Sequence, residues 1–213
     1  TSLLGLTSLI EVEGDLEITS NSALASYNGM DVLTDVSGSV VLGQNDVQDL
    51  THLNSLTIIG GVLEVKDNDL LETISGFQML NRVAGLENSN ISDLSSITGY
   101  DLLANIDGDL IINILTSLAS LDIFNFTTVS GNITITNNGT LLDLFGLENI
   151  TGYNDLNTVI VASNDSLSCP PPPTISFEID EGPCTTPVLQ DCPISGTADI
   201  FVTTQVDLDS LDN

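Results

Sequence analysis

The stretch "LIEVEGDLEITSN", from Leu9 to Asn21, decides the fold because the chain repeats it. A shift of 24 residues reaches "LTDVSGSVVLGQN", and a further 23 residues reaches "LTIIGGVLEVKDN". The common frame is L-x-x-(V/I)-x-G-x-(L/V)-x-(I/V/L)-x-x-N. Four later segments follow it less closely: "LNRVAGLENSN", "LANIDGDLIIN", "FTTVSGNITITNN" and "LNTVIVASN". Seven copies at a spacing of about 23 residues predict a solenoid whose coils contact only their neighbours.

The second half of the frame has the pattern of a strand, because apolar and variable residues alternate over four positions. The residues expected to point inward are Leu16, Ile18, Val40, Leu42, Leu63, Val65, Leu110, Ile112, Ile133, Ile135, Val159 and Val161. The segments between strands are rich in Gly, Ser, Asn and Thr and are mostly too short for long helices. The sequence therefore predicts an all-β parallel solenoid of about seven coils.

Glycines recur just before the expected strands, at Gly14, Gly38, Gly61, Gly85, Gly108 and Gly131. A corner that needs a positive φ or a close backbone approach would explain them. The fourth copy of the frame is about one residue short. We therefore expect one irregular coil at that point.

Asparagines fall at the turn that leaves the strand, at Asn21, Asn45, Asn68, Asn138 and Asn164. An inward Asn can bond the exposed backbone of its own coil and of the next one, so stacked copies would form a ladder. A leucine follows three residues later and is expected to re-enter the core. These leucines are Leu24, Leu71, Leu141 and Leu167. The "GL" pair at Gly146 then begins the side that leads to the next strand.

The frame, with "GL" before the next round, resembles the receptor L domain over about residues 3 to 168. That resemblance implies a right-handed, leucine-rich-repeat-like β-solenoid, as in insulin-receptor and epidermal-growth-factor-receptor ectodomains. The same domain type occurs in GPI-anchored fungal cell-wall glycoproteins and in microbial surface proteins. No ligand-contact motif of the receptors can be placed on this chain, which also lacks their cysteine-rich modules. The resemblance therefore implies an extracellular surface protein of the wall or microbial type.

The charge balance is extreme. Lys66 and Arg82 are the only lysine and arginine, the chain has 30 acidic residues, and the net charge is −28. Such a surface repels nucleic acid and anionic membranes and attracts cations. A solvated, soluble surface is the simpler interpretation, and binding of divalent cations is the other. The chain has no apolar run near 18 residues, so we expect no transmembrane helix and no membrane insertion.

The repeat stops at Ser168, which predicts a β-solenoid over 1–168 and an extension over 169–213. The extension opens with four prolines and holds all three cysteines, Cys169, Cys184 and Cys192. Their clustering predicts one disulfide, and any of the three pairings leaves one thiol over. The later segment "ADIFVTTQVDLDSLD" alternates apolar and polar residues, which predicts one or two strands. These strands would pack back on the solenoid, start a further domain or add to a neighbouring molecule.

Little in the chain points to catalysis. The one histidine, His52, lies in a linker between coils, and we interpret it as a surface residue. A pair among the many carboxylates could hydrolyse a glycoside, but chance proximity explains such pairs equally well. We therefore expect no enzymatic activity and no cofactor. Calcium is the one alternative, with Asp67, Asp69, Asp107 and Asp109 as candidate ligands, although solvated turns explain these residues as well.

Six N-x-S/T sequons are present. Asn138 and Asn164 are also ladder candidates, and an inward Asn cannot carry a sugar. The candidate glycosylation sites are therefore Asn90, Asn125, Asn132 and Asn149.

We expect a non-enzymatic structural or adhesive protein of a cell surface, wall, sheath or filament. Its expected partners are another protein or further copies of itself, and a polysaccharide is a further candidate. The alternative hypothesis is the ligand-binding ectodomain of a receptor. That hypothesis calls for an exposed apolar patch on one sheet, and Val41, Val62, Ile111 and Ile160 are the outward apolar residues that could form it.

Overall fold

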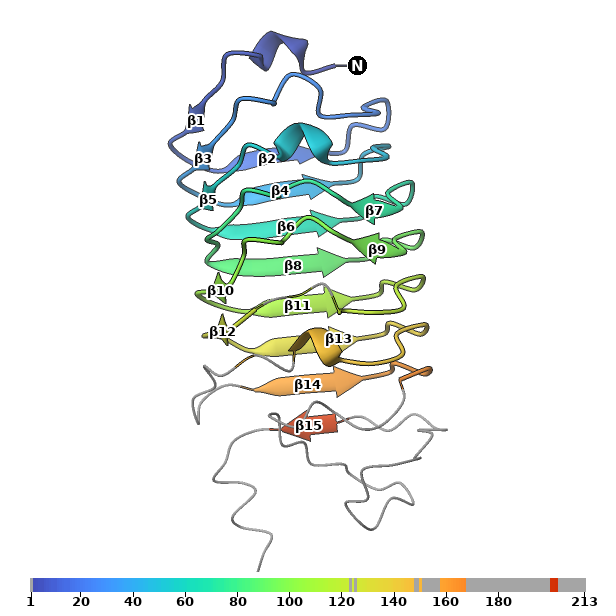
Figure 1. The fold of residues 1–213 in the computed structure, drawn as a ribbon. Helices are drawn as coiled ribbons and strands as arrows, with labels where there is room; N and C mark the ends of the chain where they lie inside the picture. Colours follow the sequence, from blue (N-terminus) through green and yellow to red (C-terminus); the bar gives the residue numbers. More distant parts are fainter. Residues whose placement is uncertain are drawn as a thin grey trace, which may run out of the picture.

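The protein is a stack of short strands. The structure, a computed structural model, describes residues 2–122, 124, 126–147, 150, 158–167 and 200–202. Helical structure in this part is confined to three single turns: η1 (Leu4–Leu6), η2 (Thr51–Leu53) and η3 (Phe145–Leu147). The strands form a parallel β-solenoid of about six turns, which confirms the expected all-β class (Figure 1).

One long sheet runs the length of the solenoid. Its parallel strands, which define coils 1 to 7 in order, are β2 (Leu16–Thr19), β4 (Val40–Gly43), β6 (Val62–Lys66), β8 (Gly85–Ser89), β11 (Leu110–Asn113), β13 (Ile133–Thr136) and β14 (Val159–Ala162). Paired residues are separated by 24, 23, 23, 24, 23 and 26 positions, so seven strands enclose six turns. Every residue expected to point inward is buried except Leu16 in the first coil, which is half-buried.

Shorter strands lie on two further sides of the solenoid. One side carries β1 (Glu11–Val12), β3 (Asp35–Val36) and β5 (Ile58–Ile59), and then β10 (Asn105–Ile106) and β12 (Thr128–Val129). The other carries β7 (Thr73–Ile74) and β9 (Ser96–Ile97). On the first of these sides, coil 4 contributes only the isolated bridges Ile58 to Arg82 and Val83 to Ile106.

In coils 3, 4 and 6 the return half of the coil buries every third residue. In coil 3 these residues are Asn68, Leu71, Ile74, Phe77 and Leu80, all with no exposed surface. The Leu71 N–H donates to the Asn68 carbonyl at 3.0 Å, and the Leu80 N–H donates to the Phe77 carbonyl at 2.9 Å. Tight turns thus carry the chain around the core without a long helix.

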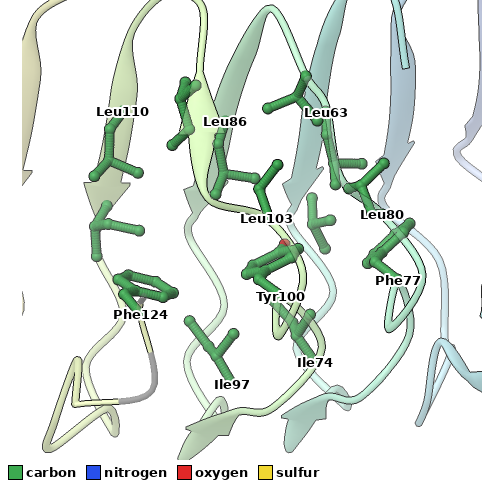
Figure 2. Packing of buried hydrophobic residues seen from close by; sticks show 14 of the residues in the cluster. Leu63, Ile74, Phe77, Leu80, Leu86, Ile97, Tyr100, Leu103, Leu110 and Phe124 are labelled. Carbon is green, nitrogen blue, oxygen red and sulfur yellow. The ribbon is translucent and has the colours of Figure 1, made fainter. Parts of the chain in front are cut away.

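Aromatic side chains stack along the solenoid axis in the middle coils. Figure 2 shows Phe124, Tyr100 and Phe77 in a row across the view, with Leu110, Leu86 and Leu63 from the long sheet in a second row above them. The ring centroids of Phe77 and Tyr100 are 5.9 Å apart, and those of Tyr100 and Phe124 are 6.3 Å apart. Their burial adds large apolar surfaces to a mostly aliphatic core.

Close packing requires the corner glycines that stack on a preceding coil, whereas a Cβ on Gly14 in the first coil would meet nothing within 4 Å. No corner glycine has a positive φ, since Gly29 is the one described glycine that does. A Cβ on Gly131 would lie 2.4 Å from the Gly108 carbonyl carbon, and a Cβ on Gly61 would lie 2.8 Å from that of Gly38. The prediction was wrong for Gly85, which was expected at the corner before the strand. It lies inside β8, where it pairs with Val62. Coil 4 is one residue short at its corner, and Ala84 takes the place of the glycine.

Most of the C-terminal extension lies outside the described residues, as do Cys169, Cys184 and Cys192. The predicted boundary near residue 168 and the predicted disulfide therefore stay predictions. The strand β15 (Ile200–Val202) is described, and it pairs antiparallel with β14 through Ile160 and Phe201. This pairing ends the long sheet with a strand of opposite direction.

Candidate functional site

Asparagines at the turn after the strand bond each coil to the one before it. The Asn45 Oδ1 accepts the Asn21 N–H at 3.0 Å, and the Asn68 Oδ1 accepts the Asn45 N–H at 3.0 Å. The Asn68 Nδ2 donates to the Leu42 carbonyl at 3.0 Å. Each side chain thus bonds to one backbone N–H and one backbone carbonyl of the preceding coil, which ties the two coils together.

A second set of these bonds lies towards the C-terminus. The Asn138 Oδ1 accepts the Leu115 N–H, and the Asn164 Oδ1 accepts the Asn138 N–H, both at 2.9 Å. Between the two sets, Ile91 and Leu115 occupy the position after the strand and carry no carboxamide. Asn21 is exposed, whereas the other four expected ladder residues are buried.

A row of left-handed residues precedes the ladder positions, and sequence reasoning missed it. Its members, with φ between 51° and 60°, are Ser20, Gln44, Asp67, Asn90, Ile114, Asn137 and Ser163. Six of the seven are polar, which could have revealed the row, because Asn and Asp tolerate this conformation best. Ile114 is β-branched, so its φ of 54° is a strained exception.

The outer face of the long sheet changes character along the solenoid. In its first four coils it carries Glu17, Glu64 and Glu87, and Glu64 and Glu87 are paired on neighbouring strands. Lys66 forms an ion pair with Glu64, and this contact raises the pKa of the lysine. Over β11, β13 and β14 the outward residues are uncharged: Ile111, Asn113, Thr134, Thr136, Ile160 and Ala162.

The outward apolar residues do not form one exposed patch. Val62 is 40% exposed, whereas Val41, Ile111 and Ile160 are half-buried. Val41 and Val62 lie in coils 2 and 3, among acidic neighbours, while Ile111 and Ile160 lie on the uncharged part of the sheet.

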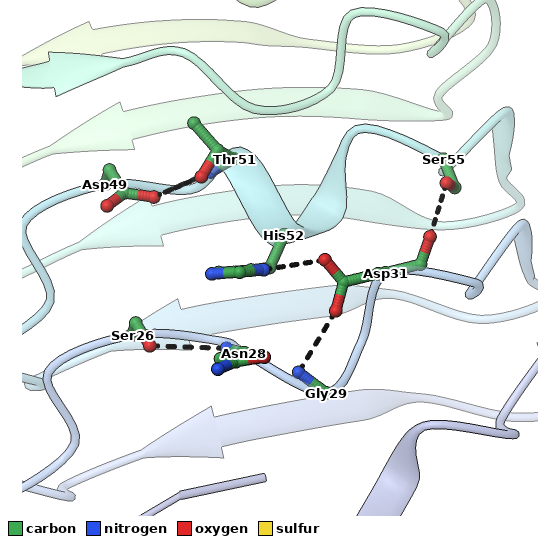
Figure 3. Close-up of polar contacts among 8 residues, drawn as sticks. All are labelled: Ser26, Asn28, Gly29, Asp31, Asp49, Thr51, His52 and Ser55. Carbon is green, nitrogen blue, oxygen red and sulfur yellow. Dashed lines mark hydrogen bonds and ion pairs between the residues drawn. The ribbon is translucent and has the colours of Figure 1, made fainter. Parts of the chain in front are cut away.

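His52 joins two coils through a carboxylate, as Figure 3 shows. Its Nδ1 lies 2.7 Å from the Asp31 Oδ1, and the other carboxylate oxygen of Asp31 accepts the Gly29 N–H at 3.2 Å. The bond from His52, followed by that from Gly29, lowers the pKa of Asp31. The Ser55 hydroxyl donates to the Asp31 backbone carbonyl.

This cluster has the residue types of a catalytic triad but not its connections. In a triad the hydroxyl bonds to the histidine, which in turn bonds to the acid. Here the Ser55 hydroxyl bonds to a main-chain carbonyl, and the Thr51 hydroxyl bonds to Asp49. The contacts of His52 and Ser55 therefore fasten η2 to the preceding coil.

The candidate calcium ligands are separated by the fold. Asp67 follows β6 and accepts a bond from the Asn90 Nδ2, and Asp69 accepts the Ser92 hydroxyl at 3.3 Å. Asp107 and Asp109 precede β11, where they bond to the Arg82 Nε and to the Asn132 N–H. Among the described residues, no three His, Cys, Asp or Glu side chains gather closely enough to hold a metal ion.

Two of the four candidate glycosylation sites are described. Asn90 and Asn132 are both exposed. The Asn90 Nδ2 bonds to Asp67, and the Asn132 Oδ1 accepts the Thr158 N–H at 2.9 Å. Asn125 and Asn149 lie outside the described residues.

The chain was compared with family models, curated proteins and solved structures, and nothing matches in any of the three. In the part of the chain that the structure describes, no helix is long and apolar enough to cross a membrane.

Proposed function

We propose that this protein is a non-enzymatic structural or adhesive element of a cell surface, acting outside the cell and assembling into a wall, sheath or filament. The observation that carries the proposal is the continuous outer face of the long sheet. Seven parallel strands hold its side chains in columns at the spacing of a sheet, about 4.8 Å. Such a stack presents a long surface with regular spacing to another protein, to further copies or to a polysaccharide.

Three further features support this proposal. The described core is filled with aliphatic and aromatic side chains, as expected of a stiff scaffold. The polar cluster at His52 is used to join coils. The resemblance of the repeat to the receptor L domain fits a surface protein. Acids on the outer face keep the protein soluble or recruit cations that bridge neighbouring molecules.

Electron microscopy of the purified native material, with and without a calcium chelator, tests the proposal. We expect regular filaments or sheets, and their loss on chelation would identify calcium as the bridge between copies. Immunogold labelling of intact cells should place the protein outside. Single particles under both conditions, or label found only after permeabilisation, would contradict the structural role.

A ligand-binding receptor ectodomain is the second candidate function, and the uncharged outer face over β11, β13 and β14 favours it. Ile111 and Ile160 lie on that face beside Thr134. A ligand that binds there would be lost on Thr134→Lys and retained on Thr19→Lys, a matched outward substitution in β2. Equal retention by both variants would contradict a receptor site on this face.

A further inference from the structure

We propose that coil 4 is a hinge in the solenoid, about which the coils before it tilt relative to the coils after it. The long sheet stays closed during this motion. The side that carries β5 and β10 opens. The inference concerns the mechanics of the stack and does not rest on the proposed function.

The first observation is the break on the β5 and β10 side. Strands β1, β3 and β5 form one sheet, and β10 and β12 form another. Coil 4 has no strand between them, only isolated bridges and a further backbone bond from the Asn81 N–H to the Thr57 carbonyl at 3.0 Å. The bridging hydrogen bonds run from the Ile59 N–H to the Arg82 carbonyl and from the Asp107 N–H to the Val83 carbonyl, both at 3.1 Å.

The corner before β8 is the second observation. The corner before β6 makes two backbone bonds to the preceding coil, from the Gly60 N–H to Val36 and from the Gly61 N–H to Gly38, both at 2.8 Å. The shortened corner of coil 4 makes one such bond, from the Ala84 N–H to the Gly61 carbonyl at 2.9 Å. The deletion of one residue thus removes a fastening on the same side as the break.

The interior of coil 4 is the third observation. Ile91 stands where coils 2 and 3 have ladder asparagines, so no ladder side chain bonds coil 4 to coil 3. The carboxamide of Asn90 bonds to Asp67 of coil 3, but it does so on the exposed turn. Asn88 occupies the inward strand position that Val65 and Ile112 hold in the neighbouring coils. Its Oδ1 accepts the Tyr100 hydroxyl at 3.1 Å, whereas its buried Nδ2 has no partner. A buried donor without a partner costs stability.

The long sheet and the aromatic stack define where the axis lies. Strand β8 pairs with β6 over five residues and with β11 over four. The rings of Phe77, Tyr100 and Phe124 are in contact across coils 3 to 5. These contacts hold the long sheet and the core together, while the corner before β8 has lost a bond. Bending about the long sheet would change the curvature of the outer face.

Amide hydrogen exchange on the full native chain tests the hinge. We compare the protection factor of Asp107 with those of Ser37 and Ser130, whose N–H groups make the matching bonds to the preceding coil in coils 2 and 6. The protection factor of Ile59, whose N–H bonds forward to coil 4, is compared with the same two residues. We expect Ile59 and Asp107 to be less protected by at least about tenfold, because local opening exposes them first. Leu86 and Leu110, in the long sheet, should be equally protected.

Two results would overturn the hinge. Equal protection of Ile59, Asp107, Ser37 and Ser130 would show that this side does not open preferentially. A loss of protection at Leu86 that matches the loss at Ile59 would show that coil 4 unfolds as a whole.

A repaired variant gives an independent check. It inserts a glycine between Val83 and Ala84 and carries Ile91→Asn, which restores both the corner and the ladder side chain. Protection at Ile59 and Asp107 should rise at least about tenfold towards that of Ser37. Asp93→Gln adds a carboxamide at an exposed position two residues later and should leave the protection of Ile59 and Asp107 unchanged. If the repaired variant does not fold, the native comparison still decides.

Discussion

At the scale of single residues, the ladder asparagines do more for stability than their polarity suggests. Asn138 has no exposed surface, and its side chain bonds to the Leu115 N–H and to the Ile112 carbonyl. Removing the side chain leaves a buried N–H without an acceptor. We expect Asn138→Ala to lower the free energy of unfolding by about 2 to 4 kcal/mol, measured by urea denaturation.

Asn81→Ala is the control for that substitution, because Asn81 is exposed and its described bond is made by the backbone. It should change the free energy of unfolding by less than about 0.5 kcal/mol. An equal effect of both substitutions would mean that the ladder bonds add no stability of their own.

The contact between His52 and Asp31 predicts a pH dependence with a definite sign. The folded state lowers the pKa of Asp31 from its ordinary value of 3.8, first through His52 and then through Gly29. The carboxylate therefore contributes stability above pH 3.8, and that contribution is lost as the pH falls through the lowered folded pKa. We expect His52→Gln to raise the titration midpoint of the Asp31 carboxyl. This midpoint can be measured by carbon NMR of the carboxyl group.

As a control, Asp93→Asn, at an exposed acid in a different coil, should leave the Asp31 midpoint unchanged. An Asp31 midpoint that is unchanged by His52→Gln would contradict the assigned cause of the shift.

At the scale of elements, the corners are limited by the distance between stacked backbones. A Cβ at Gly131 would lie 2.4 Å from the Gly108 carbonyl carbon and 2.6 Å from the Asp109 nitrogen. Backbone atoms cannot move aside as the end of a side chain can. We therefore expect Gly131→Ala to lower the free energy of unfolding by about 1 to 3 kcal/mol, again measured by urea denaturation.

Gly14 provides the matched control, since it holds the same position in the first coil and a Cβ there would meet nothing within 4 Å. Gly14→Ala should be neutral or should stabilise the protein by up to about 1 kcal/mol, because alanine restricts the unfolded chain. If both substitutions destabilise equally, the corner glycines serve the backbone conformation and not the close approach.

The strands were predictable because two patterns coincide at the same residues. Apolar residues alternate along each strand, and the same apolar positions recur at the spacing of the repeat. Leu63 and Val65 repeat as Leu110 and Ile112, and all four are buried. From the sequence, Gly85 was expected at the corner before the strand, whereas it lies inside β8. Because coil 4 is one residue short, it can be aligned with the other coils in two ways, and the glycine taken alone favours the wrong alignment. Strand pairing with Val62 decides between them, and that pairing is a tertiary contact.

The candidate site was less predictable, because its groups are brought together by stacking. Asp31 and His52 are 21 positions apart, and nothing near either residue indicates the contact between them. From the sequence alone, Asn88 is indistinguishable from an ordinary polar residue of a strand. Its burial follows from the register of β8, which turns it inward against Tyr100.

At the scale of the whole molecule, the charge opposes the fold that the core stabilises. The net charge is −28, and stacking places like charges side by side, as in Glu64 with Glu87 and Glu11 with Asp35. Paired like charges on neighbouring strands destabilise a sheet. Unfolding separates them, so the folded state carries more of the repulsion.

Salt should therefore stabilise this protein. The distance over which charges interact falls from about 30 Å at 0.01 M to about 3 Å at 1 M ionic strength. We expect the urea midpoint to rise with sodium chloride, and we expect Glu87→Gln to reduce that rise more than Asp93→Asn, an exposed acid outside the strands. Calcium chloride at matched ionic strength separates screening from binding. An equal midpoint in both salts means screening alone, whereas a higher midpoint in calcium requires a site that the folded chain or its assembly supplies. A midpoint that does not respond to sodium chloride would mean that the repulsion persists in the unfolded chain.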